Sequence, residues 1–170
     1  MCRLHASGGC FRTPLGLSIP IMQDPTNMLV RVQNLSKEYR RGQTLVSALQ
    51  DVTLDVKAGE FCAFVGPSGC GKSTLLNLIG GLDQPTAGTI AIENRPVTHA
   101  SATEWTRLRR ELIGIVFQAF HLIPGLTVAE NVALPLLLKG ERGAAVAERV
   151  NEVLEAVRMD RRRSHRPGEL

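Results

Sequence analysis

Two stretches of the chain alternate between apolar and polar residues, which is the pattern of β-strands with one buried face. The first covers residues 29–35 and is followed by a polar segment that contains Gly42. The second carries Val46, Leu49, Val52, Leu54 and Val56 and ends in a turn at Ala58 and Gly59. A further strand is predicted at residues 89–93, with a turn at residues 94–96. The pattern therefore predicts several strands that are buried on one face.

Two other stretches are apolar throughout, which is typical of strands buried on both faces. Residues 61–65 read FCAFV, and residues 112–117 read LIGIVF. We predict a core strand at each of them. Strands of this kind lie in the middle of a sheet and need neighbours on both sides.

Helices are predicted from capping signals and from apolar residues at three- and four-residue spacing. One follows residue 74 and ends near Gly80 and Gly81. Two more cover residues 101–111 and 127–138, each opened by a Ser or Thr three residues before a glutamate, the spacing of a capping box. The fourth, at residues 143–157, places on one face Val146, Val150, Val153, Leu154 and Val157.

Composition bounds the class of protein and its domain organisation. The chain has 170 residues, of which 44% are hydrophobic and 21% charged, as expected for one globular domain. Residues 1–27 are rich in Gly, Pro, Ser and Cys and show no regular period. We predict a disordered leader or a start-site artefact there, and a partial domain at residues 28–170.

Charge, cysteine spacing and apolar run length argue against nucleic-acid binding, a zinc site and a membrane span. The formal net charge is +4, and much of it lies in a run of five arginines between residues 158 and 166. Because no Phe, Tyr or Trp interrupts this run, we interpret it as a solvated helix end or connector and expect no direct nucleic-acid binding. The four cysteines lack zinc-like spacing. No apolar run approaches the ~20 residues that a membrane span requires.

The chain also contains the phosphate-binding loop pattern G-x-x-x-x-G-K-[ST] without a gap. The loop is made of Gly66, Pro67, Ser68, Gly69, Cys70, Gly71, Lys72, Ser73 and Thr74. In such a loop the glycines let backbone N–H groups turn toward an anion, the lysine reaches the outer phosphates, and the next hydroxyl can ligate Mg²⁺. We therefore predict a nucleotide site in which Lys72 and Ser73 have these two roles.

Four segments occur in an order that indicates a family. They are LSKEY at residues 35–39, ALQDVTL at 48–54, the phosphate loop with LLNLIGGLDQPTAG at 75–88, and IGIVFQ at 113–118, which continues to TVAENV at 127–132. With these segments the chain resembles the ATP-binding subunit of ABC transporters, of the type found in macrolide-export and lipoprotein-release systems.

The resemblance implies a fold, cofactors and partners. The fold would be α/β, of the P-loop NTPase and ABC type, with a mixed sheet, an antiparallel β subdomain and the start of a helical subdomain. Tyr39 would stack on the adenine of ATP, Gln118 would ligate Mg²⁺ or position water, and Lys72 and Gln118 would act in hydrolysis. The partners would be a transmembrane permease subunit and a second ATP-binding subunit in a homodimer. Such a subunit is expected in the cytoplasm, at the inner face of the cell membrane.

The sequence departs from this family at Leu170, where it ends. The family continues there into a Ser-Gly-Gly-Gln signature, a Walker B aspartate with a catalytic glutamate, and a switch histidine. We therefore expect an N-terminal fragment that binds ATP without hydrolysing it. Two other interpretations are a soluble ABC ATPase that acts on nucleic acid or ribosomes, and a remnant without function.

Overall fold

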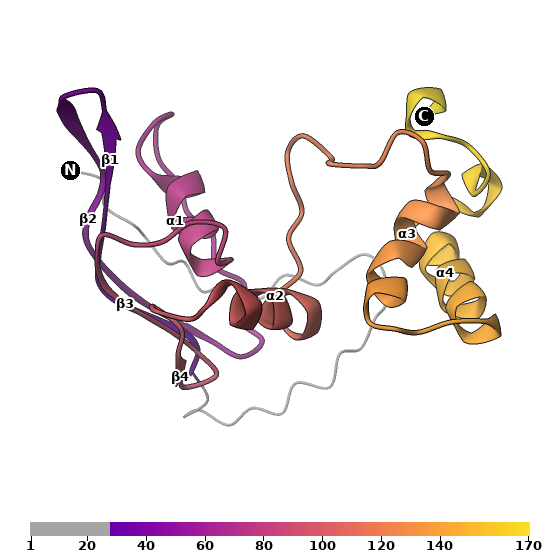
Figure 1. Ribbon diagram of the computed structural model, residues 1–170, viewed down its shortest axis with the longest axis horizontal. Coiled ribbons are helices and arrows are strands. Elements are labelled where there is room, and N and C mark those ends of the chain that lie inside the picture. Colours follow the sequence, from indigo (N-terminus) through magenta and orange to yellow (C-terminus); the bar gives the residue numbers. More distant parts are fainter. Residues whose placement is uncertain (1–27) are drawn as a thin grey trace. The chain divides into compact units, whose positions relative to one another are not determined.

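The computed structural model describes residues 28–170, which form two compact units (Figure 1). The first unit ends at Ile113, and the second covers Gly114–Leu170. Each unit has a hydrophobic core of its own. The leader predicted at residues 1–27 lies outside the described residues.

A four-stranded antiparallel sheet is the framework of the first unit. Its strands are β1 (Met28–Arg41), β2 (Thr44–Lys57), β3 (Ala87–Ile92) and β4 (Arg95–Pro96), in the order β2-β1-β3-β4. The alternating stretches form strands as predicted, and β1 also includes most of the polar segment after Leu35. That extension forms because its residues pair with β2, as Tyr39 does with Val46. The hairpin turns at Gly42, whose φ of +64° favours glycine.

The core strands predicted at residues 61–65 and 112–117 are wrong. Neither segment forms a strand or joins the sheet. Their apolar residues are at most partly buried: Phe64 and Ile113 pack against the core, whereas Val65 is 73% exposed and Val116 is 100% exposed. A strand with two apolar faces needs strands beside it and a layer on each face. Within residues 28–170 there is one sheet, and it is antiparallel. The two apolar runs therefore have no parallel sheet to join, and their preference for burial is not fully met.

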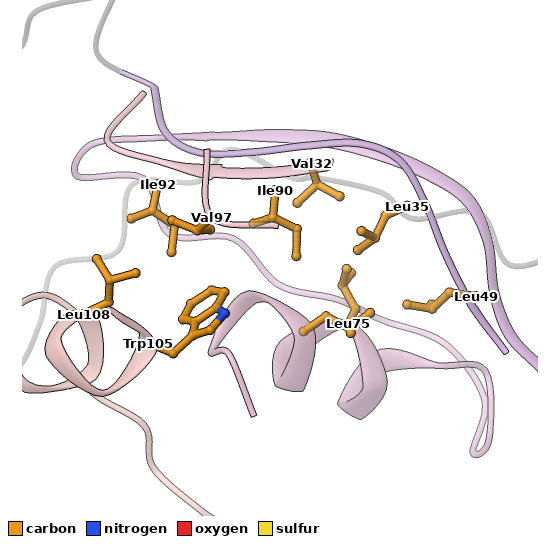
Figure 2. Packing of buried hydrophobic residues seen from close by; sticks show 10 residues of the cluster. Val32, Leu35, Leu49, Leu75, Ile90, Ile92, Val97, Trp105 and Leu108 are labelled. Atoms are coloured by element: carbon orange, nitrogen blue, oxygen red, sulfur yellow. The ribbon is translucent and has the colours of Figure 1, made fainter. Parts of the chain in front are cut away.

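Helices α1 (Lys72–Ile79) and α2 (Ala102–Glu111) complete the first unit. Their apolar side chains share one core cluster with the sheet, which comprises Val32, Leu35, Leu49, Leu75, Leu78, Ile90, Ile92, Val97, Trp105 and Leu108. Figure 2 shows Leu75, Trp105 and Leu108 facing the strands. Trp105 therefore packs α2 against the sheet.

Both predicted capping boxes are present. The Ser101 hydroxyl accepts a hydrogen bond from the N–H of Glu104, whose carboxylate accepts one from the N–H of Ser101. Thr127 and Glu130 make the same pair of bonds at the start of α3 (Val128–Leu138). Each carboxylate also accepts a hydrogen bond from the hydroxyl of the same Ser or Thr. The bond from the backbone N–H first, and the bond from the hydroxyl second, hold the pKa of each glutamate below its usual range.

In the second unit, α3 packs against α4 (Ala144–Ala156). The core of this unit consists of Val128, Val146, Val150 and Leu154. The predicted apolar face of α4 was too wide, because Val153 and Val157 are exposed. Two short 3-10 helices follow, η1 (Asp160–Arg162) and η2 (Pro167–Glu169), and the five arginines of the 158–166 run are exposed.

The close approach of Gly81 to Trp105 gives a test of this core. A Cβ at Gly81 would overlap the Trp105 ring, whereas a Cβ at Gly42 would meet nothing within 4 Å, although both residues have φ near +65°. Both substitutions by alanine carry a backbone cost of about 1–2 kcal/mol. We expect Gly81→Ala to lower the free energy of unfolding by roughly 1–3 kcal/mol more than Gly42→Ala, because of overpacking. Equal losses in urea unfolding followed by circular dichroism would contradict the packing.

Candidate functional site

The phosphate loop joins β2 and α1 through a close backbone contact at Gly71. Gly69 and Gly71 have φ values of +79° and +93°, a region that favours glycine. A Cβ at Gly71 would lie 2.5 Å from the carbonyl oxygen of Ala48 and 2.7 Å from Cδ2 of Leu49. Any larger residue at position 71 would therefore push the start of α1 away from the sheet.

The start of α1 presents backbone donors. Gly71 is the N-cap, and the first helical hydrogen bond runs from the N–H of Leu75 to the Gly71 carbonyl, at 2.9 Å. The N–H groups of Lys72, Ser73 and Thr74 thus precede the helical ladder and point out of the helix end. The first turn contains no acidic side chain, so the partial positive charge of this end is not neutralised locally. This arrangement suits an anion.

The Lys72 side chain lies across the loop. Its Nζ donates hydrogen bonds to the carbonyl oxygens of Gly66 and Pro67, at 2.8 and 2.7 Å, and lies 3.5 Å from Sγ of Cys70. These carbonyls hold the ammonium at the mouth of the loop. A phosphate that enters can replace them as acceptor, with a stronger, charge-assisted bond.

A cavity of about 500 Å³ lies beside the loop. Residues 47–52 of β2 line one side of it, and Cys70, Gly71 and Lys72 line the other. This volume lies within the range of small-molecule sites. The cavity therefore lies between β2 and the part of the phosphate loop that carries Lys72.

Tyr39 is held close to the loop by polar contacts. Its hydroxyl donates a hydrogen bond to Oδ2 of Asp83, at 2.7 Å, and Lys37 Nζ lies over its ring, 4.8 Å from the centroid. Burial and the bond to Asp83 raise the pKa of Tyr39, while a hydrogen bond with Thr74, the last loop residue, acts in the opposite direction. This bond places the Tyr39 hydroxyl next to Thr74, while the stacking of Tyr39 on adenine stays a prediction.

Asp83 and Lys37 were not predicted as site residues. Lys37 Nζ lies 2.7 Å from Oδ1 of Asp83. Burial alone would raise the pKa of Asp83, but hydrogen bonds from Lys37, Tyr39 and the N–H of Gln84 outweigh it and lower that pKa. No sequence signal links residues 46 positions apart, so only the fold shows this contact.

Gln118 belongs to the second unit, and its role as a metal ligand stays a prediction. It is exposed on the irregular segment that leads to α3. Asn131 fixes the end of this segment: its side chain accepts from the N–H of Ile123 and donates to the carbonyls of Ile123, Leu126 and Thr127. Among residues 28–170, no cluster of three His, Cys, Asp or Glu side chains could hold a metal ion.

Comparison with known proteins identifies the family. The family model for ABC transporters matches residues 49–170, which include the phosphate loop, α1 and the whole second unit. The chain belongs to the ABC transporter family. An uncharacterized ABC transporter ATP-binding protein of Methanocaldococcus jannaschii, MJ0796, is 42% identical over 146 residues, or 84% of this chain and 62% of that protein.

Solved structures of ABC cassettes agree with the fold. A dimeric post-hydrolysis structure of MJ0796 bound to ADP and Pi matches with a TM-score of 0.77 at 44% identity, and another dimeric structure of MJ0796 matches with 0.76 at 43%. Each match covers 83% of this chain and 62% of the solved chain. The predicted fold class, a partial P-loop fold of ABC type, is confirmed. The chain spans about 62% of the length of these relatives.

The Tyr39–Asp83 bond can be tested by titration, because Tyr39 is the single tyrosine of the chain. Asp83 raises the pKa of Tyr39 through a hydrogen bond and through its charge. Asp83→Ala should therefore lower that pKa, so that tyrosinate absorbance develops at lower pH than in the wild type. Asp55→Ala is the control, since Asp55 pairs with Arg31 instead. An unchanged titration in Asp83→Ala would contradict the contact.

Proposed function

We propose that this chain binds ATP with Mg²⁺ at the phosphate loop, as part of an ABC transporter subunit that couples ATP binding and hydrolysis to transport. The observation that carries the proposal is the loop itself: three backbone N–H groups at the start of α1 precede the helical hydrogen bonds, and the Lys72 ammonium is held by the carbonyls of Gly66 and Pro67 in the same loop. Together these groups form a site for the phosphates of a nucleotide.

The phosphates would be bound by backbone and lysine together. Lys72 would exchange the carbonyls of Gly66 and Pro67 for phosphate oxygens, while the N–H groups of residues 72–74 stay fixed by the helix. Donors that are already in place need little reorganisation when charge develops on the phosphates. Lys72 would thus contribute both to binding and to phosphoryl transfer.

Ser73 and Gln118 would supply oxygen ligands for Mg²⁺. Ser73 stands at the start of α1, and its side chain is exposed, so its hydroxyl is accessible to an ion held by the phosphates. Mg²⁺ prefers oxygen ligands and usually combines one or two protein groups with phosphates and water. Bound there, it would neutralise part of the phosphate charge. Gln118 would complete the set or position a water molecule.

The adenine would stack on Tyr39, which the contact with Thr74 keeps beside the loop. Aromatic stacking contributes to the binding of nucleic-acid bases by about 1–3 kcal/mol per base. Base and phosphates would thus be bound by two parts of the same unit, residues 28–113.

The partners follow from the family. MJ0796 has been solved as a dimer bound to ADP and Pi. We propose that this protein likewise dimerises and acts with a separate transmembrane permease, as a peripheral protein on the cytoplasmic face of the cell membrane. The residues ENV at 130–132, followed by LPL at 134–136, favour the macrolide-export or lipoprotein-release type. No helix within residues 28–170 has the length and apolarity of a membrane span.

Substitution of Lys72 tests phosphate binding. Hydrogen bonds to charged groups contribute about 1.5–3 kcal/mol, so Lys72→Ala should weaken the binding of Mg·ATP by roughly 10- to 100-fold. Lys57→Ala is the matched control, because it removes one positive charge at the exposed end of β2. Isothermal titration calorimetry would measure both. Equal affinities for Lys72→Ala and the wild type would contradict the proposed site.

The expected absence of ATP turnover by the 170-residue chain can also be tested. We expect the 170-residue chain to bind Mg·ATP without measurable turnover, because the family's signature, Walker B and switch residues do not occur in it. A phosphate-release assay would measure turnover. Turnover by the purified chain that Lys72→Ala abolishes would show that the chain hydrolyses ATP by itself.

A further inference from the structure

Lys37, Asp83 and Tyr39 form a connected polar cluster beside the phosphate loop, which we call the tyrosine clamp. We propose that Lys37 and Asp83 are positioning residues that hold the Tyr39 ring as a one-sided platform for the base of the nucleotide. The inference rests on the proposed function and names two residues that act in it through Tyr39.

Asp83 connects the other two side chains. Its Oδ1 accepts from Lys37 Nζ and its Oδ2 accepts from the Tyr39 hydroxyl, both at 2.7 Å. Asp83 is itself fixed, because Oδ1 also accepts from the N–H of Gln84, at 2.7 Å, and Lys37 donates to the Gln84 carbonyl, at 2.6 Å. The phenol is therefore tied to the backbone that follows α1.

The ion pair in the clamp is shielded from solvent. The Lys37 and Asp83 side chains are 11% and 28% exposed, whereas the Arg31–Asp55 pair of the same unit is 43% and 42% exposed. Exposed pairs are weakened by water and salt, and partly buried ones much less. The clamp can therefore hold the Tyr39 ring where an exposed pair could not.

Lys37 also determines which face of the ring can meet a base. Its ammonium lies over one face, at 4.8 Å from the centroid, a distance typical of a cation–π contact. A planar base can then stack on the opposite face only, and Tyr39 is exposed enough to offer it. The main chain of Tyr39 is held separately, by its pairing with Val46 in β2. The clamp thus leaves the side chain little freedom.

A free ring would have to be ordered when the base binds. Ordering one flexible side chain weakens binding by roughly 3- to 10-fold. Loss of the clamp should therefore reduce the affinity for the base but not for the phosphates, because the N–H groups of α1 and Lys72 do not depend on it.

The test compares two ligands on the 170-residue chain, Mg·ATP and Mg·tripolyphosphate, which lacks the base and the ribose. Dissociation constants are measured by calorimetry for the wild type, Asp83→Ala, Tyr39→Phe and the double variant. We expect each single variant to bind Mg·ATP about 3- to 10-fold more weakly and Mg·tripolyphosphate unchanged. Both remove the Tyr39–Asp83 hydrogen bond, Asp83→Ala together with the ion pair to Lys37 and Tyr39→Phe together with the bond to Thr74. The loss in the double variant should therefore be smaller than the sum of the two single losses.

One control and one further test variant sharpen the comparison. Asp55→Ala removes a carboxylate from an exposed pair in the same unit and should bind both ligands like the wild type. Lys37→Met keeps an unbranched apolar stem without the charge and should reproduce the loss for Mg·ATP. Tyr39→Phe removes one oxygen atom, so it tests the bond even if Asp83→Ala does not fold.

The outcomes separate this inference from the proposed function. If Asp83→Ala or Tyr39→Phe binds Mg·ATP like the wild type, if the losses add in the double variant, or if both ligands lose affinity equally, the clamp does not position the ring. Wild-type binding of Mg·ATP no tighter than of Mg·tripolyphosphate would also overturn it. A wild-type chain that binds neither ligand would overturn the proposed function and the clamp with it.

Discussion

The packing of α1 on the antiparallel sheet is the contact on which the site depends. Leu75 and Leu78 are buried in the core that the helix shares with the strands. Because they fix the axis and rotation of α1, they also fix the direction of the N–H groups at its start. Gly71 completes this arrangement, since only a residue without Cβ can approach the Ala48 carbonyl so closely. Because the N–H groups of residues 72–74 belong to the backbone of α1, their positions are fixed as firmly as the helix itself.

The same helix also links the phosphate loop to the base platform. The chain leaves α1 through a turn in which the N–H of Leu82 donates to the carbonyl of Asn77, at 2.8 Å, and Asp83 follows directly. The start of α1 therefore carries the phosphate donors, and the backbone after its end carries the anchor of Tyr39. Lys37 and Tyr39 come from β1, which packs against α1 through Val32 and Leu35. One rigid core thus sets the distance between the two halves of the site.

Local signals predicted most elements of this fold. The alternation of apolar residues predicted β1 and β2, and the spacing from Ser101 to Glu104 and from Thr127 to Glu130 predicted two capping boxes that the structure contains. The phosphate loop could also be predicted from the sequence, because its chemistry requires particular residue types at fixed spacing. In each of these cases the interacting residues lie within a few positions of one another.

Features that depend on distant residues could not be predicted in this way. The apolar runs at residues 61–65 and 112–117 show a preference for burial, but strand formation depends on which neighbours the rest of the chain supplies. The bond between Tyr39 and Asp83 joins residues 44 positions apart and involves an aspartate in an ordinary turn sequence. The motif identifies the groups that contact phosphate, whereas the packing of β1 against α1 decides which side chains support the base. For this reason the residues that would contact phosphate can be predicted from the sequence, whereas the residues that support Tyr39 are found only in the folded chain.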